Sequence, residues 1–115
     1  MWLTGVFGAD EVKSVMEGDS VTLNPDLTQI QGFNQILWRF GSQGSIASIV
    51  GKDISYEDDE IFRDRLELDQ TGNLTIKNMK TKHSGRYKAE INHSTGTLST
   101  IFIVNVYGKH HIWSH

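Results

Sequence analysis

Apolar and polar residues alternate along most of the chain, in short segments that are separated by turn residues. A period of two places every second side chain on the same face of the backbone, which is typical of β-strands. In one such segment Ile36, Trp38 and Phe40 are expected to share a face. The alternation predicts about nine strands, at Val12–Met16, Ser20–Leu23, Ile36–Phe40, Ile46–Val50, Ile54–Tyr56, Phe62–Leu68, Leu74–Ile76, Arg86–Asn92 and Leu98–Val106.

The pattern contains no convincing amphipathic helix, so it predicts an all-β fold in which two sheets pack as a sandwich. A β-barrel with the same number of strands is the geometric alternative. The 115 residues are enough for one domain with a core of its own. We therefore expect a single all-β domain.

Charge and composition restrict the partners of this domain. Eleven basic and fourteen acidic side chains give a formal net charge of −3, so nucleic acid is not an expected partner. The sequence has no cysteine, which excludes disulfides, thiolate metal sites and thiol nucleophiles. No apolar run approaches the roughly 20 residues that span a bilayer, so we expect membrane attachment only through segments outside this chain.

The titratable side chains form no HExxH motif, nucleophile elbow or phosphate-binding loop. The acidic run Glu57–Glu60 is interpreted as a solvated loop, because successive side chains of an extended chain point to opposite sides. No carboxylate or fixed strand organises the cluster of His110, His111 and His115. We therefore expect no enzyme, no catalytic residue, no metal, no cofactor and no small-molecule substrate.

The two ends differ from the alternating middle of the chain. Residues 1–10 contain the apolar segment Met1–Ala9, which is similar to the end of a secretory signal. A flexible terminus is the alternative interpretation. Residues 109–115 follow Gly108 and are expected to be a flexible tail, so the folded domain is expected at residues 11–108.

Three motifs at characteristic distances favour the sandwich over the barrel. They are Val21–Pro25 (VTLNP), the tryptophan Trp38, and His83–Ala89 (HSGRYKA). Together they resemble the immunoglobulin variable-type fold, a Greek-key sandwich with a buried strand C tryptophan and a tyrosine corner on strand F. The resemblance implies that the Tyr87 hydroxyl bonds to the backbone at the turn before strand F. It also implies a structural core that includes Leu23, Trp38, Leu74, Tyr87 and Ala89.

The two cysteine positions of the family hold Pro25 and Ala89 here, so the inter-sheet disulfide is missing. A disulfide between these two positions would close a long loop and would contribute about 4 kcal/mol to the free energy of unfolding. A second pair of the family, an arginine near strand D and an aspartate before strand F, corresponds to Ile61 and His83. Because both partners are changed, we expect an apolar contact at this place instead of an ion pair.

Among variable-type domains, the chain most resembles the amino-terminal domains of the CD2 and SLAM family of lymphocyte receptors, a group that tolerates a missing disulfide. Fish genomes carry many such receptors, so a fish member is one alternative. The matching stretches are Ser20–Leu23, Ile36–Phe40, Phe62–Leu68, Gly72–Ile76, Ser84–Tyr87 and Phe102–Gly108.

This resemblance implies a recognition or adhesion module on the extracellular side of the plasma membrane, or a secreted one. Its implied partner is another immunoglobulin-type domain, self or related, which it binds through the sheet of strands G, F, C, C′ and C″. Alternation along these strands places six candidate partner-binding side chains outward. They are Leu37, Arg39, Lys88, Glu90, Ile101 and Ile103. The alternative for the two isoleucines is that they only contribute β-propensity to a solvated strand.

The alternative function is an intracellular structural domain of a scaffold protein, similar to cysteine-free domains of the immunoglobulin I-set. The long segment Gly41–Ile61 favours the surface receptor, because it has room for both C′ and C″ strands. An extracellular location also gives meaning to two sequons, Asn73-Leu74-Thr75 and Asn92-His93-Ser94. Asn73 and Asn92 are therefore candidates for glycosylation.

Overall fold

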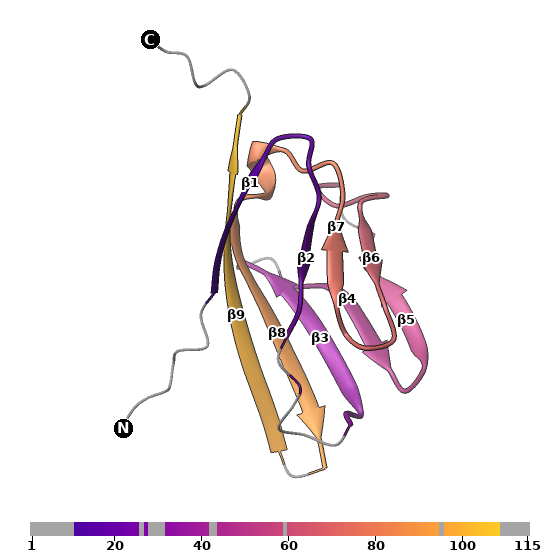
Figure 1. Cartoon of the computed structure of the whole chain (residues 1–115). Helices are drawn as coiled ribbons and strands as arrows, with labels where there is room; N and C mark the ends of the chain where they lie inside the picture. The colour runs from indigo at the N-terminus through magenta and orange to yellow at the C-terminus, as the bar shows by residue number, and fades with distance from the viewer. Residues whose placement is uncertain are drawn as a thin grey trace, which may run out of the picture.

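A computed structural model describes residues 11–25, 27, 32–41, 44–58, 60–94 and 96–108. The segments expected to be a leader or flexible terminus (1–10) and a tail (109–115) lie outside these residues. The described part holds nine strands and one 3₁₀ helix (Figure 1). They are β1 (Glu11–Met16), β2 (Val21–Leu23), β3 (Gln35–Phe40), β4 (Ser45–Val50), β5 (Asp53–Tyr56), β6 (Leu66–Leu68), β7 (Leu74–Ile76), η2 (Thr81–His83), β8 (Gly85–His93) and β9 (Gly96–Tyr107).

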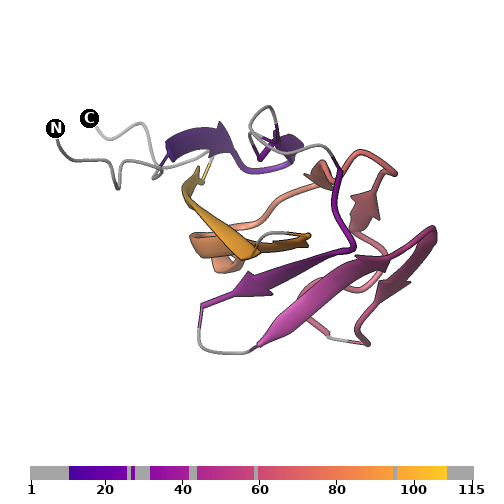
Figure 2. The same cartoon turned by 90° about the horizontal axis from the view of Figure 1, so that it is seen from below.

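The strands form two sheets that pack as a sandwich, which Figures 1 and 2 show from the side and from below. The larger sheet has six strands in the order β1-β9-β8-β3-β4-β5, and the smaller one has the order β2-β7-β6. Every pairing is antiparallel except that of β1 with β9, which is parallel. The predicted all-β immunoglobulin V-type Greek-key sandwich is therefore confirmed. The first strand, β1, joins the six-stranded sheet and not the sheet of β2, β7 and β6.

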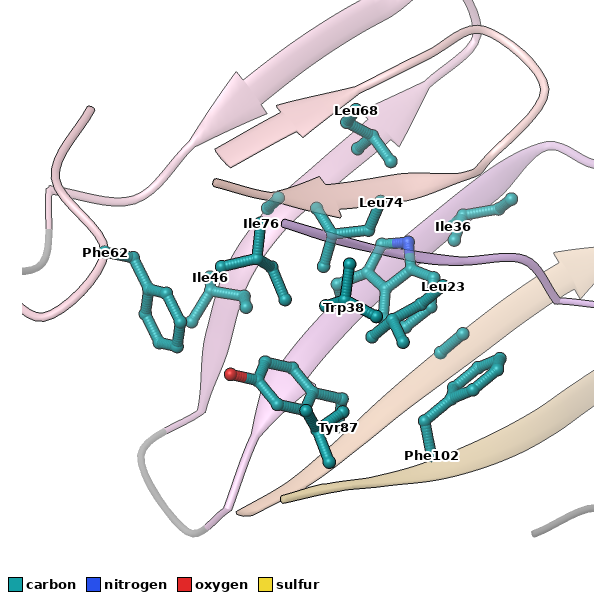
Figure 3. Packing of buried hydrophobic residues seen from close by; sticks show 14 of the residues in the cluster. Leu23, Ile36, Trp38, Ile46, Phe62, Leu68, Leu74, Ile76, Tyr87 and Phe102 are labelled. Carbon is teal, nitrogen blue, oxygen red and sulfur yellow. The ribbon is translucent and has the colours of Figure 1, made fainter. Parts of the chain in front are cut away.

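The core lies between the sheets, and Trp38 is at its centre (Figure 3). Alternation along β3 turns Ile36 and Trp38 inward, and both are fully buried. The Trp38 ring lies 5.6 Å from the ring of Phe102 between centroids, an aromatic contact that joins β3 to β9. The five side chains that the sequence assigns to the core are all fully buried: Leu23, Trp38, Leu74, Tyr87 and Ala89.

The positions that hold cysteines in related domains are both buried here, as Pro25 and Ala89. Side-chain hydrogen bonds provide other connections between the sheets. The indole Nε1 of Trp38 donates to the carbonyl of Gly72, in the turn between β6 and β7, at 3.2 Å. The amide of Leu68 on β6 donates to the hydroxyl of Tyr56 on β5 at 2.9 Å. Together with the packed core, these bonds hold the layers in register.

The turn before β8 is fixed from inside the protein. The hydroxyl of Tyr87 donates a 2.6 Å hydrogen bond to the carbonyl of His83, which confirms the expected tyrosine corner. Burial raises the pKa of Tyr87, so the hydroxyl keeps its proton and remains a donor. His83 ends η2 and is itself fully buried.

The structure corrects two expectations in this region. The expected apolar contact between Ile61 and His83 is polar, because His83 Nε2 lies 2.7 Å from the Ile61 carbonyl oxygen. The expected strand Phe62–Leu68 is also too long, since only Leu66–Leu68 is extended. Residues before it form a turn in which the amide of Arg65 donates to the carbonyl of Phe62 at 3.0 Å. Asp64 has a φ of 62° there, which no strand accommodates.

Candidate recognition face

The six-stranded sheet has one surface that is turned away from the core, which we call the outer face. It carries the side chains that alternate with buried ones along β9, β8, β3, β4 and β5. The cross-strand pairs Leu37 with Glu90, Arg39 with Lys88, and Lys88 with Ile101 connect its centre. The six residues predicted from the sequence all lie on this face: Leu37, Arg39, Lys88, Glu90, Ile101 and Ile103.

Charged side chains occupy the middle of the outer face. Glu90 accepts both neighbouring cations, with Arg39 Nε at 3.2 Å from Oε1 and Lys88 Nζ at 3.3 Å from Oε2. Partial burial alone would raise the pKa of Glu90, but the hydrogen bonds and charges of Arg39 and Lys88 lower it. The carboxylate therefore stays ionised and pairs with both cations.

A basic hollow opens beside this cluster, where β3 ends and β8 begins. Its volume is about 460 Å³, and it is lined by Arg39, Gly41, Arg86 and Lys88. Arg86 forms no ion pair with any other described residue. Three cations meet one carboxylate here, so this end of the outer face is locally positive on a chain whose formal net charge is −3.

The outer face also carries most of the large apolar side chains that the described part of the chain exposes. Val12 is 65% exposed, Val50 54%, Tyr107 48% and Met16 38%. The fifth such residue of the described part, Tyr56, lies on the opposite face of the sheet, where its hydroxyl accepts a hydrogen bond from Leu68 of the smaller sheet. Val12 lies beside Ile103, because β1 and β9 pair in parallel with these two residues in register. The apolar surface is thus wider than the pair of isoleucines that the sequence indicated.

Sequence reasoning missed Val12, Met16, Val50 and Tyr107 as members of this face. The missing information was the partner of the first strand, since parallel pairing with β9 joins residues that are about 90 positions apart in the sequence. For Val50 and Tyr107 the signal was present, because each follows a buried residue in an alternating strand.

The two sequon asparagines lie at separate places. Asn73 is in the turn between β6 and β7, where its Nδ2 atom contacts Asp69 Oδ2 at 3.3 Å. Asn92 lies on the outer face near the end of β8, and its Nδ2 atom donates to Gln35 Oε1 at 3.1 Å. Both side chains are partly accessible.

The described residues hold no group of three histidine, cysteine or carboxylate side chains that could bind a metal ion. Within the same part of the chain, none of the helices has the length and apolar character needed to cross a bilayer. The outer face carries apolar, cationic and anionic side chains.

Comparison with solved structures identifies the architecture. The first immunoglobulin-like domain of human CD48 antigen superposes with a TM-score of 0.76 at 22% identity, over 85% of this chain and 82% of that one. The fold is that of an immunoglobulin V-type domain. A structure of CD84, whose title refers to SLAM family function, aligns with a TM-score of 0.68 at 21% identity, over 85% of this chain and 97% of that one.

The CD2-binding domain of CD58 is a further structural relative, with a TM-score of 0.65 at 20% identity over 84% of this chain and 53% of that one. The V-type domain described here thus resembles domains of the CD2 and SLAM group in its structure. At these identities the likeness concerns the fold. No protein-family model and no curated protein sequence matches the chain.

Proposed function

We propose that this domain is a recognition module that binds another immunoglobulin-type domain through its outer face, at the extracellular side of the plasma membrane or as a secreted protein. The observation that carries the proposal is the position of the exposed apolar side chains. Four of the five large ones in the described part, Val12, Met16, Val50 and Tyr107, lie on the outer face. Three of them lie in two neighbouring pairs along β1 and β9, Val12 with Ile103 and Met16 with Tyr107, and adjoining exposed apolar side chains of this kind mark interaction sites.

The mixed character of the face defines the kind of complex. Interfaces between proteins that also exist apart are, as a whole, about as apolar as the rest of the protein surface, so a face that carries both apolar and charged side chains fits such an interface. The cluster of Arg39, Glu90 and Lys88 is pre-organised by its own ion pairs, so it contributes to partner choice more than to affinity. We expect dissociation constants on the order of micromolar and fast exchange.

An intracellular scaffold domain is the second candidate. It would have a short connection between strands C and D, without a complete C′–C″ pair. Here β4 and β5 form a hairpin with four paired positions, which extends the outer face by two strands. This hairpin favours the surface receptor because it enlarges the sheet that would bind a partner.

The proposal is tested by NMR shift mapping of the labelled domain, against itself at high concentration and against the V-type domains of CD48 and CD84. We expect shifts at residues of β9, β8 and β3, and loss of binding when Ile101→Asp places a charge on the face. Thr22→Asp is the matched control, because Thr22 is exposed on β2 of the other sheet. Shifts confined to β2, β6 and β7, or complexes indifferent to Ile101→Asp, would contradict the proposal.

A further inference from the structure

The basic hollow holds more positive charge than the described part of the chain neutralises. Arg39 and Lys88 lie directly opposite each other on β3 and β8, an arrangement in which like charges repel. Glu90 pairs with both of them and compensates one of these charges. Arg86 adds a third cation to the lining and has no ion pair among the described residues. Two positive charges in the hollow are therefore left without a counterpart.

The surroundings of Arg86 leave its guanidinium group open to a ligand. Its side chain is exposed, and its cross-strand neighbour on β9 is the apolar residue Ile103. On the side of β3 its neighbour is Gly41, whose amide donates to the Arg86 carbonyl at 2.8 Å. A Cβ atom added to Gly41 would meet no atom within 4 Å. The lack of a side chain at Gly41 thus keeps the hollow open beside the guanidinium group.

The three cations lie in two rows across the strands. Arg39 and Lys88 share one row, and Arg86 lies two residues before Lys88 on the same face of β8. Two residues of a strand span about 7 Å. A single small anion contacts one row at close range, whereas a ligand with two oxyanion groups at a comparable spacing contacts both. A guanidinium group presents paired N–H donors that match the oxygen atoms of such groups.

We infer that the basic hollow binds a sulfated saccharide, with one sulfate group between Arg39 and Lys88 and a second one at Arg86. The volume of the hollow, about 460 Å³, lies within the range of sites for small ligands. Two sulfate groups on one rigid ring system match both the two uncompensated charges and the spacing of the rows. The choice of a saccharide rests on the extracellular location in the proposed function, where sulfated saccharides are the polyanions that basic patches meet.

The formal net charge of −3 does not oppose such a site. The screening length in physiological salt is about 8 Å, so a ligand in the hollow responds mainly to the charges that line it. Glu90 is already paired with two of the lining cations, which limits its repulsion of a sulfate group. Binding should therefore be measurable at physiological salt and should weaken as the salt concentration rises.

Titration with sucrose octasulfate tests the site by calorimetry and by the NMR signals of the Arg86 side chain and of the Gly41 and Lys88 amides. Sucrose is the unsulfated control, and sodium sulfate at the same total sulfate concentration and ionic strength represents the free anion. We expect sucrose octasulfate to shift these signals and sucrose to leave them unchanged. Free sulfate should bind at least about tenfold more weakly, because two groups on one ring bind together. Equal binding of free sulfate would overturn the saccharide as the ligand.

Gly41 offers a matched pair of substitutions. Its φ of 53° lies in the left-handed region that asparagine and aspartate also adopt, so Gly41→Asn and Gly41→Asp change the backbone alike. Only Gly41→Asp places a carboxylate in the hollow. It should weaken the binding of sucrose octasulfate at least about tenfold relative to Gly41→Asn. Equal affinities of the two variants would place the ligand outside the hollow and overturn the inference.

Arg86→Gln removes the unpaired cation and should weaken binding to a similar extent. Lys52→Gln is its control, because Lys52 is exposed in the turn between β4 and β5 and also has no ion pair among the described residues. The control variant removes the same net charge and should bind sucrose octasulfate like the unchanged protein. Equal losses in both variants would show that only the net charge matters, which would overturn the assignment of the site.

The outcomes separate this site from the proposed function. If sucrose octasulfate does not bind while a V-type domain shifts the signals of the outer face, the proposed function stands and the saccharide site is wrong. If sucrose octasulfate binds with the expected effects of the variants while no immunoglobulin-type domain binds, the saccharide site stands and the proposed partner is wrong.

Discussion

The Nε2 atom of His83 lies 2.7 Å from the carbonyl oxygen of Ile61. On the other side of the same ring, Nδ1 accepts a 2.8 Å hydrogen bond from the amide of Lys80. This pair of contacts assigns the neutral tautomer that carries its hydrogen on Nε2, because Nδ1 has to accept and Nε2 has to donate. The buried imidazole thus joins the loop before β6 to the turn before β8, at the place where related domains have an ion pair.

We predict that the domain loses stability as the pH falls below the ordinary histidine pKa of 6.5. Burial lowers the pKa of His83, and the charges of Arg65, Lys82 and Lys80 add to this, although the bond to Ile61 opposes it. The unfolded chain then binds more protons than the folded one in this range, so the free energy of unfolding rises with pH. The stabilisation is fully present above the pKa that His83 has in the unfolded chain. It is lost as the pH falls through the lower pKa that His83 has in the folded domain.

The measurement is chemical denaturation between about pH 8 and about pH 5, for the unchanged domain and for His83→Gln. The variant is expected to be less stable at high pH and to show a flatter pH dependence, since it has no titrating group at this position. Parallel curves for the two proteins would show that His83 does not control the acid sensitivity.

Removing the hydroxyl of Tyr87 tests the turn before β8 through the hydrogen bond that Tyr87 donates to it. Tyr87→Phe keeps the packed ring but leaves the His83 carbonyl without its donor at 2.6 Å. We therefore expect the free energy of unfolding to fall by about 1–3 kcal/mol. Tyr107→Phe is the control, because that side chain is exposed on the outer face and should change stability by less than about 0.5 kcal/mol. Equal effects of the two substitutions in urea denaturation would contradict the importance of the tyrosine corner.

The strands were predictable where alternation is regular and the partner is nearby in sequence. For β8 the buried residues Tyr87, Ala89 and Ile91 follow a period of two, and the motif around Tyr87 fixes its place in the fold. The expected strand from Phe62 onward was wrong, because the turn at Asp64 depends on a single backbone angle that the hydrophobic pattern does not encode. Phe62 is buried all the same, which explains why the pattern includes it.

The centre of the outer face was also accessible from the sequence, while its extent was not. Parity along β3 and β8 places Arg39, Lys88 and Glu90 outward, but their ion pairs depend on register. The burial of two successive residues, Ile46 and Ala47, accompanies the bulge between Trp38 and Arg39, which shifts β4 against β3 by one residue. Such irregularities arise from packing and leave little trace in a sequence.

Trp38 should be essential for the stability of a domain that has no disulfide. Trp38→Ala removes the largest fully buried side chain, and we expect a loss of about 3–5 kcal/mol in urea denaturation. Trp38→Phe retains part of the packing but removes the donor to the Gly72 carbonyl, so its cost should be smaller. A cooperative transition at nearly unchanged denaturant concentration for Trp38→Ala would refute the assignment of Trp38 to the centre of the core.

Expression through a secretory pathway of animal cells should produce a glycoprotein. Both sequon asparagines are partly accessible, so glycosidase treatment is expected to lower the apparent mass. Ser94→Ala should remove the contribution of Asn92 without changing its contact with Gln35, and Asn73→Gln should remove the other. An unchanged mass after secretion and glycosidase treatment would withdraw this support for an extracellular location.

Gly72 provides a test of close packing between the turn after β6 and strand β3. Its φ is 94°, and an added Cβ atom would lie 2.5 Å from Ile36 Cδ1. Gly72→Ala therefore combines backbone strain with a steric clash, whereas Gly51→Ala has a φ of 63° and no atom within 4 Å. We expect the free energy of unfolding to fall by about 1 kcal/mol for Gly51→Ala and by about 2 kcal/mol or more for Gly72→Ala, because strain and overpacking add at Gly72.

Shortening the neighbouring side chain separates the two contributions. Ile36→Val removes the Cδ1 atom that the new methyl group would meet, so Gly72→Ala should cost less in that background than in the unchanged protein. The free energies of unfolding of the four proteins in this double-mutant cycle give the coupling directly. Additive effects would mean that the clash is relieved elsewhere, and that backbone strain alone accounts for the glycine.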